Sequence, residues 1–384
     1  MVQHVLVAPD KFKGSLTAAE VASHVAAGLG VPAVELPVAD GGDGTVDAAV
    51  ASGYSRITIE ATGPTGRPVS ASYAWHPTGT AVVELAEASG LRRLPGEREP
   101  LTATSRGTGD LIADAVRRGA KRVVLGLGGS ACTDGGAGLA QALGARFLDA
   151  EGNDLPPGGA ALKNLDRIDM SGFLDISGVE FVVASDVDNP LLGPHGAAAV
   201  YGPQKGATPE DVKTLEAGLA RLAALATATH GLMGAVEHDD VPRAMGVAGA
   251  PGAGAAGGVG FAALAFLHAE VRPGIDYLLD LLGFDAHAEG ARLVITGEGS
   301  LDEQTLRGKA PAGVARAAAR AGVPVVAVCG RSTLSESDLK AAGIEAAYAL
   351  TDIEPDPARC MAEAGPLLER LAARIAAERL AEGA

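Results

Sequence analysis

The segment GLGGSACTDGGAG (residues 126–138) stands between a strand-like run, Arg122–Leu125, and a helix-like run, Gly138–Gly144. Its first six residues satisfy the loose dinucleotide-binding pattern G-x-G-x-x-G/A, and Asp149 and Glu151 follow about where a ribose-binding carboxylate is expected. A glycine-rich connection between a strand and a helix is typical of α/β proteins. The segment therefore indicates an α/β fold, and it leaves open a nicotinamide loop, another phosphate loop or a plain connector.

The composition is that of a tightly packed α/β protein with room for two domains. The chain has 384 residues, of which 47% are hydrophobic, 20% are charged and 3% are aromatic. Its 53 glycines cluster at the ends of expected strands and form no low-complexity tract. A chain of this length is typical of two domains, and no apolar run is long enough to predict a membrane span.

The charge and the cysteines restrict the partners and the compartment. A net charge of −16 repels nucleic acid and anionic membranes, so we expect neither as a partner. The three cysteines are far apart in sequence and predict no disulfide framework. The N-terminal sequence lacks the basic and apolar regions of a signal peptide. We therefore expect a cytoplasmic protein.

Strand and helix patterns alternate at both ends of the chain. His4–Pro9 and Ala33–Asp40 are expected to be buried parallel strands, and Thr17 is expected to cap the first helix with Glu20 as its capping-box partner. Further strands are expected at 292–299 (with a glycine loop), 323–330 and 346–350, and further helices at 312–321, 336–342 and 357–380. Such alternation favours a parallel sheet.

The middle of the chain has a different character. Three β-rich runs, at 55–64, 66–76 and 80–89, leave no room for helices between them and predict antiparallel strands. We therefore expect a discontinuous Rossmann-like α/β domain, residues 1–60 plus 288–384. A second, α+β domain, residues 61–287, is inserted into it.

Five expected strands end in loops rich in Gly, Asp or Lys. These loops are APDKFKGS (8–15), VADGGDG (38–44), GLGGSACTDGGAG (126–138), ASDVDNPL (184–191) and TGEGSLDEQTLRGK (296–309). Ligands of open α/β sheets bind at the carboxyl ends of strands. Gly also permits tight turns and Asp also caps helices, but the recurrence at five strand ends favours a ligand site.

Common catalytic motifs are missing from these loops. A Walker A loop needs Ser or Thr after Gly-Lys, whereas Gly308-Lys309 is followed by Ala310. A nucleophile elbow needs Gly where Cys132 follows Ser130 and Ala131, and the histidines show no metal-binding spacing. Acidic groups, glycine amides and lysines remain. They suit phosphoryl transfer, which needs donors for phosphates, carboxylates for Mg²⁺ and a group that accepts a hydroxyl proton.

Two charged pairs fit this chemistry. Asp186 and Asp188 are candidates for Mg²⁺, which prefers one or two carboxylates together with water and phosphate oxygens. Lys11 and Lys13 are candidates for neutralising a small carboxylate substrate in this acidic chain.

As a set, the loops resemble those of the type-1 glycerate kinases, a bacterial family that phosphorylates D-glycerate with ATP. The matching segments, in the family's order, are APDKFKGSL (8–16), VADGGDGTVDA (38–48), GTGDLIADA (107–115), GLGGSACTDGGAGLAQALG (126–144), SDVDNPLLG (185–193), YGPQKGAT (201–208), GAGAAGGVG (252–260) and TGEGSLDEQTLRGKAP (296–311). The resemblance implies a two-domain α/β fold with the active site in the interdomain cleft. It also implies ATP and Mg²⁺ as co-substrates and phosphoglycerate as product, with 2-phosphoglycerate favoured over 3-phosphoglycerate.

Chemistry and the resemblance together assign the expected roles. The candidate catalytic residues are Asp10, Asp186 and Asp188, of which Asp186 and Asp188 are also the candidate Mg²⁺ ligands. The expected substrate-binding residues are Lys11, Lys13, Ser15, Asp40 and Asp43. The expected phosphate- and nucleotide-binding residues are Gly128, Gly129, Ser130, Thr133, Asp134, Lys205, Glu298, Asp302, Thr305 and Lys309. Cys132 is expected to pack, and Ser300 stands where the family often has Arg.

Two other functions stay open at this point. An NAD-dependent dehydrogenase would explain the first six residues of 126–138, but it has no use for the Thr-Asp-Gly-Gly extension that follows them. A non-catalytic metabolite-binding protein would explain the glycine loops but does not need the acidic pairs. The sequence also leaves open whether the chain forms a homodimer.

Overall fold

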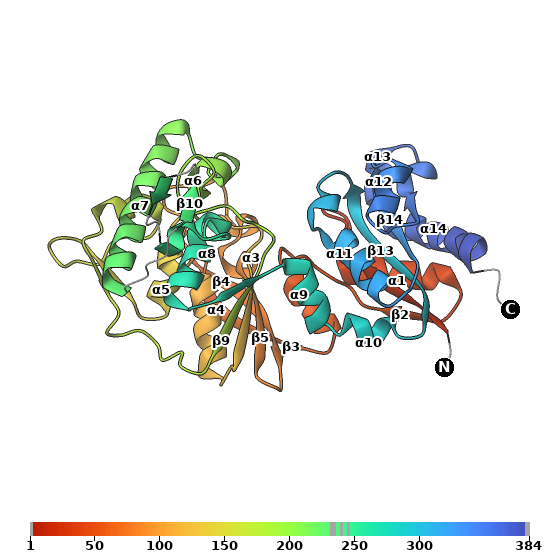
Figure 1. Ribbon diagram of the computed structural model, residues 1–384, viewed down its shortest axis with the longest axis horizontal. Helices are drawn as coiled ribbons and strands as arrows, with labels where there is room; N and C mark the ends of the chain where they lie inside the picture. The colour runs from red at the N-terminus through yellow and green to blue at the C-terminus, as the bar shows by residue number, and fades with distance from the viewer. Residues whose placement is uncertain (1–2, 231–235, 239–240, 244–245, 381–384) are drawn as a thin grey trace. The chain divides into compact units, whose positions relative to one another are not determined.

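The computed structural model describes residues 3–230, 236–238, 241–243 and 246–380. The chain divides into two compact units: unit 1 is 1–54 with 273–384, and unit 2 is 55–272 (Figure 1). The sequence places these boundaries later, after residues 60 and 287. They differ because β3 (Ser55–Thr62) already pairs with β4 in unit 2, whereas α9 (Gly274–Leu281) packs on α11 in unit 1.

Unit 1 is built on a five-stranded, wholly parallel sheet. Its strands are β1 (His4–Pro9), β2 (Ala33–Glu35), β13 (Ala291–Leu301), β14 (Val325–Ser332) and β15 (Ala346–Ala349). Their spatial order is β2-β1-β13-β14-β15, so the chain winds outward in two directions from the β1–β13 pair. Such a pair is the topological switch point of a doubly wound sheet.

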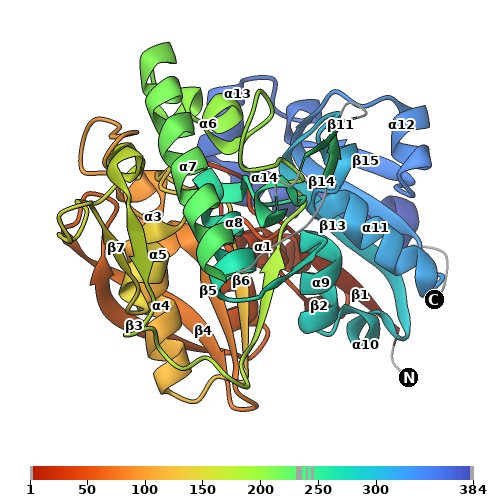
Figure 2. The same cartoon turned by 60° about the vertical axis from the view of Figure 1, so that its left-hand side comes forward.

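Helices cover the unit 1 sheet. They are α1 (Ala18–Leu29), α2 (Thr45–Ala51), α9, α10 (Phe284–Ala288), α11 (Ala310–Arg320), α12 (Glu336–Ala341), α13 (Pro357–Ala362) and α14 (Ala364–Arg379). Val5, Val7 and Ile295 point into a core closed by α1 and α14, and α11 lies along β13 and β14 (Figure 2). The predicted capping box is confirmed: Thr17 and Glu20 exchange hydrogen bonds at the start of α1.

Three predicted elements of unit 1 differ from the structure. The strand expected at 33–40 is assigned only as far as Glu35, although the N–H groups of Leu36 and Val38 still donate hydrogen bonds to the Val7 and Pro9 carbonyls of β1. The glycine loop expected at 297–299 belongs to β13, since Ser300 and Leu301 still pair with β14. The last helix, expected to be continuous over 357–380, is broken at Glu363.

Unit 2 contains a mixed six-stranded sheet in the order β12-β9-β6-β5-β4-β3. Its strands are β3, β4 (Pro68–His76), β5 (Thr80–Glu84), β6 (Arg122–Gly126), β9 (Glu180–Ala184) and β12 (Glu270–Arg272). The three β-rich runs form the antiparallel strands β3, β4 and β5, as predicted, and the rest of the sheet is parallel. Two short antiparallel pairs complete the strands: β7 (Arg146–Leu148) with β8 (Arg167–Asp169), and β10 (Val236–His238) with β11 (Val241–Arg243).

The helices of unit 2 enclose two apolar cores. They are α3 (Leu85–Ser89), α4 (Arg106–Arg117), α5 (Ala137–Ala142), α6 (Ala197–Tyr201), α7 (Pro209–His230) and α8 (Ala255–Phe266). One core lies between the sheet, α3, α4 and α8, with α4 against β3, β4 and β5 (Figure 1). The other gathers α5, α6, α7 and the opposite side of α8. None of the helices within the described residues has the length and apolar character needed to cross a membrane.

Candidate active site

Three carboxylates lie at the carboxyl ends of adjacent strands in unit 1. Asp10 follows β1 directly, Asp40 follows β2, and Glu298 lies near the end of β13. Burial raises the pKa of Asp10 to about 7; the negative charges of Asp40 and Glu298 add to this rise, and Lys11 opposes it. A carboxylate with such a pKa, at the switch point of the sheet, is suited to accept a proton near neutral pH.

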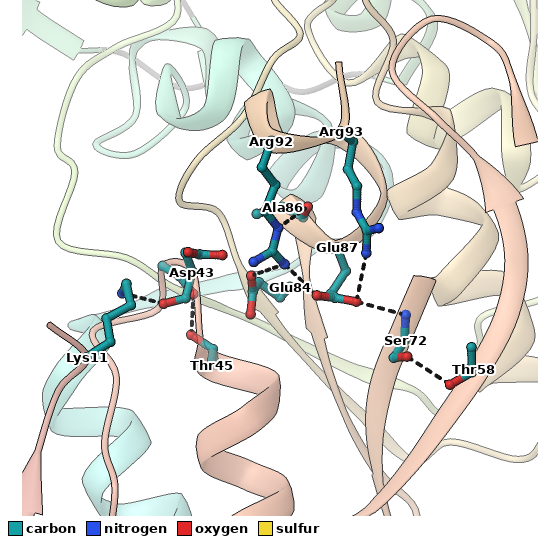
Figure 3. A network of polar contacts seen from close by, with 11 residues as sticks. Lys11, Asp43, Thr45, Thr58, Ser72, Glu84, Ala86, Glu87, Arg92 and Arg93 are labelled. Atoms are coloured by element: carbon teal, nitrogen blue, oxygen red, sulfur yellow. Dashed lines mark hydrogen bonds and ion pairs between the residues drawn. The ribbon is translucent and has the colours of Figure 1, made fainter. Parts of the chain in front are cut away.

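Lys11 connects the first two strand-end loops of unit 1. Its Nζ donates a hydrogen bond to the backbone carbonyl of Asp43 (Figure 3). The same Nζ lies 3.6 Å from Asp10 Oδ1. Asp40 stabilises its own loop by accepting a hydrogen bond of 3.1 Å from the Gly42 N–H. The predicted substrate residues Lys11, Asp40 and Asp43 therefore lie together beside Asp10.

Two other predicted substrate residues lie on the loop after β1 with different surroundings. Ser15 Oγ donates a hydrogen bond of 2.7 Å to the carbonyl of Met361 in α13, so its hydroxyl serves packing within unit 1. Lys13 is exposed. Of the two, only Lys13 has a side chain open to a ligand.

Glu298 is held by the segment that follows β13. Thr305 Oγ1 donates to Glu298 Oε1 at 2.5 Å, and Lys309 Nζ lies 3.4 Å from Oε2. The Thr305 hydroxyl also accepts a hydrogen bond of 3.0 Å from the Asp302 N–H, and Asp302 Oδ1 accepts one of 2.9 Å from Gln304 N–H. Burial raises the pKa of Glu298, while Thr305 and Lys309 oppose the rise. The segment presents the Lys309 ammonium at the N-terminus of α11, a combination that favours phosphate.

In unit 2, Asp134 supports the loop that follows β6. Its carboxylate is 1% exposed and accepts hydrogen bonds from Ser105 N–H at 2.8 Å and Ser105 Oγ at 2.9 Å. Gly136 N–H, Gly138 N–H and Thr104 Oγ1 donate at 3.1, 3.3 and 3.4 Å. Asp134 therefore ties the start of α4 to the start of α5, and burial raises the pKa of its carboxyl group.

Lys205 supports the same loop from the short helix at Pro203–Lys205. Its Nζ donates to Ser130 Oγ at 2.8 Å and to the Cys132 carbonyl at 2.6 Å. Gly128 and Gly129 precede Ser130, and Gly129 has a left-handed φ of 73° that favours glycine. Cys132 is fully buried in the core, where burial raises the pKa of its thiol.

The loop after β6 is also locked to the glycine-rich segment 252–260. Gly135 N–H donates a hydrogen bond of 3.0 Å to the Gly257 carbonyl. A Cβ at Gly257 would lie 2.1 Å from the Cys132 carbonyl, and Ala256 beside it has a left-handed φ of 54°. Thr133 Oγ1 is buried with no hydrogen-bond partner among the described residues. The glycine-rich segment 252–260 is thus packed closely against the loop after β6.

The candidate metal ligands Asp186 and Asp188 follow β9 on an irregular, exposed loop. Asn189 beside them shapes the turn: its Nδ2 donates to the His195 carbonyl at 2.8 Å, and Tyr201 Oη donates to its Oδ1 at 2.7 Å. Within the described ranges, no three His, Cys, Asp or Glu side chains gather as a metal centre. Mg²⁺ bound mainly through phosphate oxygens and water needs only one or two carboxylates, and this pair fits that requirement.

A charged network at the carboxyl end of β5 escaped the sequence analysis. Arg92 Nη2 donates to Glu84 Oε1 at 3.3 Å and to Glu87 Oε1 at 2.5 Å, as Figure 3 shows. Arg93 Nη2 and Ser72 N–H donate to Glu87 Oε2 at 3.4 and 3.1 Å. The signal available in the sequence was Glu84, an acid at the end of the apolar strand-like run 80–84, with Arg92 and Arg93 following in an acidic chain.

The serine at position 300 has a guanidinium beside it. Ser300 pairs with Arg331 across β13 and β14, and Arg331 Nε donates a hydrogen bond of 3.2 Å to Ser300 Oγ. A guanidinium from the neighbouring strand therefore lies beside position 300.

The predicted site residues therefore form two groups. The unit 1 group holds a carboxylate with a raised pKa among lysines, with Asp10 at its centre. The unit 2 group holds a supported glycine loop with Ser130 on it and the exposed Asp186 and Asp188. The first arrangement can accept a proton and bind an anion. The second can donate hydrogen bonds to phosphate and share a cation with it.

Comparison with known proteins gives consistent matches over the whole chain. Residues 5–380 match the model of the Glycerate kinase family. A curated relative, the glycerate kinase of Bacillus subtilis (strain 168), is 43% identical over 97% of this chain and 97% of its own. The glycerate 2-kinase of Escherichia coli (strain K12) is 42% identical over 90% of each chain. A crystal structure described as a glycerate kinase 2 from Salmonella typhimurium LT2 superposes with a TM-score of 0.83, at 40% identity over 98% of each chain.

Proposed function

The chain belongs to the glycerate kinase family, and we propose on that premise that it transfers the γ-phosphoryl group of ATP to a hydroxyl of D-glycerate. The observation that carries this proposal is the 43% identity to a named glycerate kinase over 97% of both chains. The chain is an enzyme of the kinase class. Its three cysteines are all free and buried, which supports the reducing cytoplasm as the proposed compartment.

Asp10 is the proposed general base. It accepts the proton of the reacting glycerate hydroxyl, for which its raised pKa near neutrality is suited. Lys11, 3.6 Å from Asp10, and the exposed Lys13 bind the glycerate carboxylate, because they are the lysines on the loop after β1. Asp40 and Asp43, on the loop after β2, are the other proposed substrate-binding residues.

The phosphates of ATP are assigned to the glycine loop and to Lys309. Gly128, Gly129 and Ser130 offer backbone amides and a hydroxyl, and Lys309 offers an ammonium at the N-terminus of α11. Asp186 and Asp188 would hold Mg²⁺, which when bound neutralises charge on the phosphate oxygens. Glu298 and Thr305 keep Lys309 in place through the contacts that they make with each other and with its ammonium.

The 2-hydroxyl is the proposed acceptor, which makes 2-phosphoglycerate the product. The printed name of the Escherichia coli relative, glycerate 2-kinase, supports this choice, and 3-phosphoglycerate is the alternative. ³¹P NMR of the product formed from D-glycerate, ATP and Mg²⁺ tests both the reaction and the position, since the two phosphomonoesters couple to different numbers of carbon-bound protons. A spectrum with no phosphomonoester and no ADP would overturn the proposal.

A thermal-shift experiment separates the kinase from the two other functions. ATP with Mg²⁺ is expected to raise the melting temperature, whereas NAD⁺ is not, because a ligand that binds the native state stabilises it by mass action. Release of ADP on addition of D-glycerate then distinguishes a kinase from a protein that only binds its metabolites. Stabilisation by NAD⁺ alone would favour the dehydrogenase.

A further inference from the structure

Lys205 is a buried lysine on which the loop after β6 rests. Only 2% of the residue is exposed, and its Nζ donates to Ser130 Oγ at 2.8 Å and to the Cys132 carbonyl at 2.6 Å. Burying an ammonium group costs free energy unless its donors are used. Both contacts lie on the loop itself, so the geometry ties the position of Lys205 to the conformation of residues 130–132.

The contact with Lys205 determines which way the Ser130 hydroxyl can act. A serine hydroxyl has one proton to donate and lone pairs that accept. The lysine ammonium can only donate, so Ser130 Oγ is the acceptor in this pair and its own proton is directed elsewhere. In the part of the chain that the structure describes, no acceptor takes that proton. Ser130, which is 7% exposed, therefore retains an unused donor on the glycine loop.

The charge of Lys205 is not cancelled by a direct ion pair among the described residues. Asp134 is the nearby carboxylate, and it contributes to the pKa of Lys205, but its oxygens accept from Ser105, Gly136 and Gly138 instead. An ammonium 2.8 Å from a hydroxyl oxygen draws electron density from it, which makes the hydroxyl a stronger donor to an anion.

We propose that Lys205 is a positioning residue for phosphoryl transfer, which acts through Ser130: it fixes the serine oxygen and presents the hydroxyl proton to a phosphoryl oxygen. The inference rests on the proposed function, and the ligand is the phosphoryl group that is transferred. The lysine itself does not touch the phosphate. Charge grows on the phosphoryl oxygens as the group transfers, so a donor that is already in place is most valuable in the transition state.

A double-mutant cycle tests the proposal through steady-state kinetics with D-glycerate and ATP. The variants are Lys205→Met, Ser130→Ala and the double variant, and the exposed Lys163→Met in the same unit is the control. Each single change is expected to lower kcat by roughly 10- to 100-fold, about the size of one lost transition-state donor, with KM for D-glycerate within about 3-fold of wild type. The kcat of the double variant is expected to be no more than about 2-fold below that of the less active single variant.

The additivity of the losses separates positioning from a structural role. If Lys205 only supported the fold, its removal would lower kcat by the same factor whether or not Ser130 carried a hydroxyl. Multiplicative losses, or wild-type kcat in Lys205→Met, would therefore overturn the proposal. If a thermal melt shows that Lys205→Met does not fold, Lys205→Gln replaces it in the cycle, because the amide keeps N–H donors and loses the charge.

The same experiment distinguishes this inference from the proposed function. A wild-type chain that forms no phosphoglycerate overturns the proposed function and this inference with it. An active wild-type chain with multiplicative losses in the cycle overturns only the role of Lys205.

Discussion

Asp10 and Asp134 are both buried carboxylates in loops that follow parallel strands, yet their surroundings are opposite. Asp134 accepts hydrogen bonds from two side-chain hydroxyls and three backbone N–H groups. Asp10 accepts one from the Lys11 N–H, at 2.6 Å, and shares its surroundings with the charges of Asp40 and Glu298. Burial alone therefore does not mark a reactive carboxylate. A carboxylate that accepts hydrogen bonds from several donors stabilises the surrounding backbone. A carboxylate with few donors keeps the capacity to accept a proton.

Replacing Asp10 with Asn gives the largest expected effect. If Asp10 accepts the hydroxyl proton, Asp10→Asn lowers kcat by roughly 10²- to 10⁴-fold, the usual contribution of a positioned general base. The fold should survive, because the change removes a charge from a cluster of like charges. Steady-state ADP release and a thermal melt measure the two quantities. The exposed Glu336→Gln in the same unit is the control, and a kcat within about 3-fold of wild type in Asp10→Asn would exclude the base role.

Replacing Asp134 should lower the free energy of unfolding, whereas replacing Asp10 should lower kcat. Asp134→Ala leaves the N–H groups of Ser105, Gly136 and Gly138 without their acceptor, which we expect to cost about 3–5 kcal/mol of unfolding free energy. Urea denaturation measures the loss. The exposed Glu151→Ala should change stability by less than about 0.5 kcal/mol. Equal stabilities for Asp134→Ala and Glu151→Ala would remove the contrast on which the comparison rests.

Local sequence patterns predicted most of the strands and helices. The wrong predictions fall where the structure depends on residues that are distant in the sequence. The apolar run of β1 and the Thr17–Glu20 capping box were visible in sequence because each depends on neighbouring residues. The stretch Gly297–Gly299 looked like a loop, since glycine signals turns. Its place in β13 is imposed by pairing with β14, a partner distant in sequence. A local pattern does not contain the information about which distant strand a segment pairs with.

The sequence predicted which residues belong to the candidate site, but it did not predict which of them contact one another. Asp10 and Glu298 were singled out because polar residues ending apolar strands meet at one edge of a sheet. No such signal predicted the hydrogen bond from Ser105 to Asp134 or the one from Lys205 to Ser130, because these partners are 29 and 75 residues apart in the sequence. Asp134 and Asp10 look alike in sequence, and only their donors separate them.

The pH dependence of the chain sharpens the contrast at Asp10. Its pKa rises from 3.8 to about 7 in the folded chain, so between these values the folded state binds more protons than the unfolded state. Stability is therefore expected to fall as pH rises through this window, whereas kcat should rise as Asp10 loses its proton. Thermal melts from pH 4 to 7 should show a shift of a few degrees that is smaller in Asp10→Asn. An identical slope in both proteins would contradict the raised pKa.

The smallest expected effect concerns the segment that locks the loop supported by Asp134. Ala256 has a left-handed φ of 54°, which costs an L-residue with a Cβ roughly 1 kcal/mol relative to glycine. Ala256→Gly should therefore raise the free energy of unfolding by about 1 kcal/mol, measured by urea denaturation. His268 has the same φ in the exposed connection between α8 and β12, and His268→Gly is the matched control. If both variants gain stability and only Ala256→Gly changes kcat, the strain at 256 acts on the loop that carries Ser130. A loss of stability in Ala256→Gly would instead show that the Ala256 methyl group contributes more packing energy than its backbone strain costs.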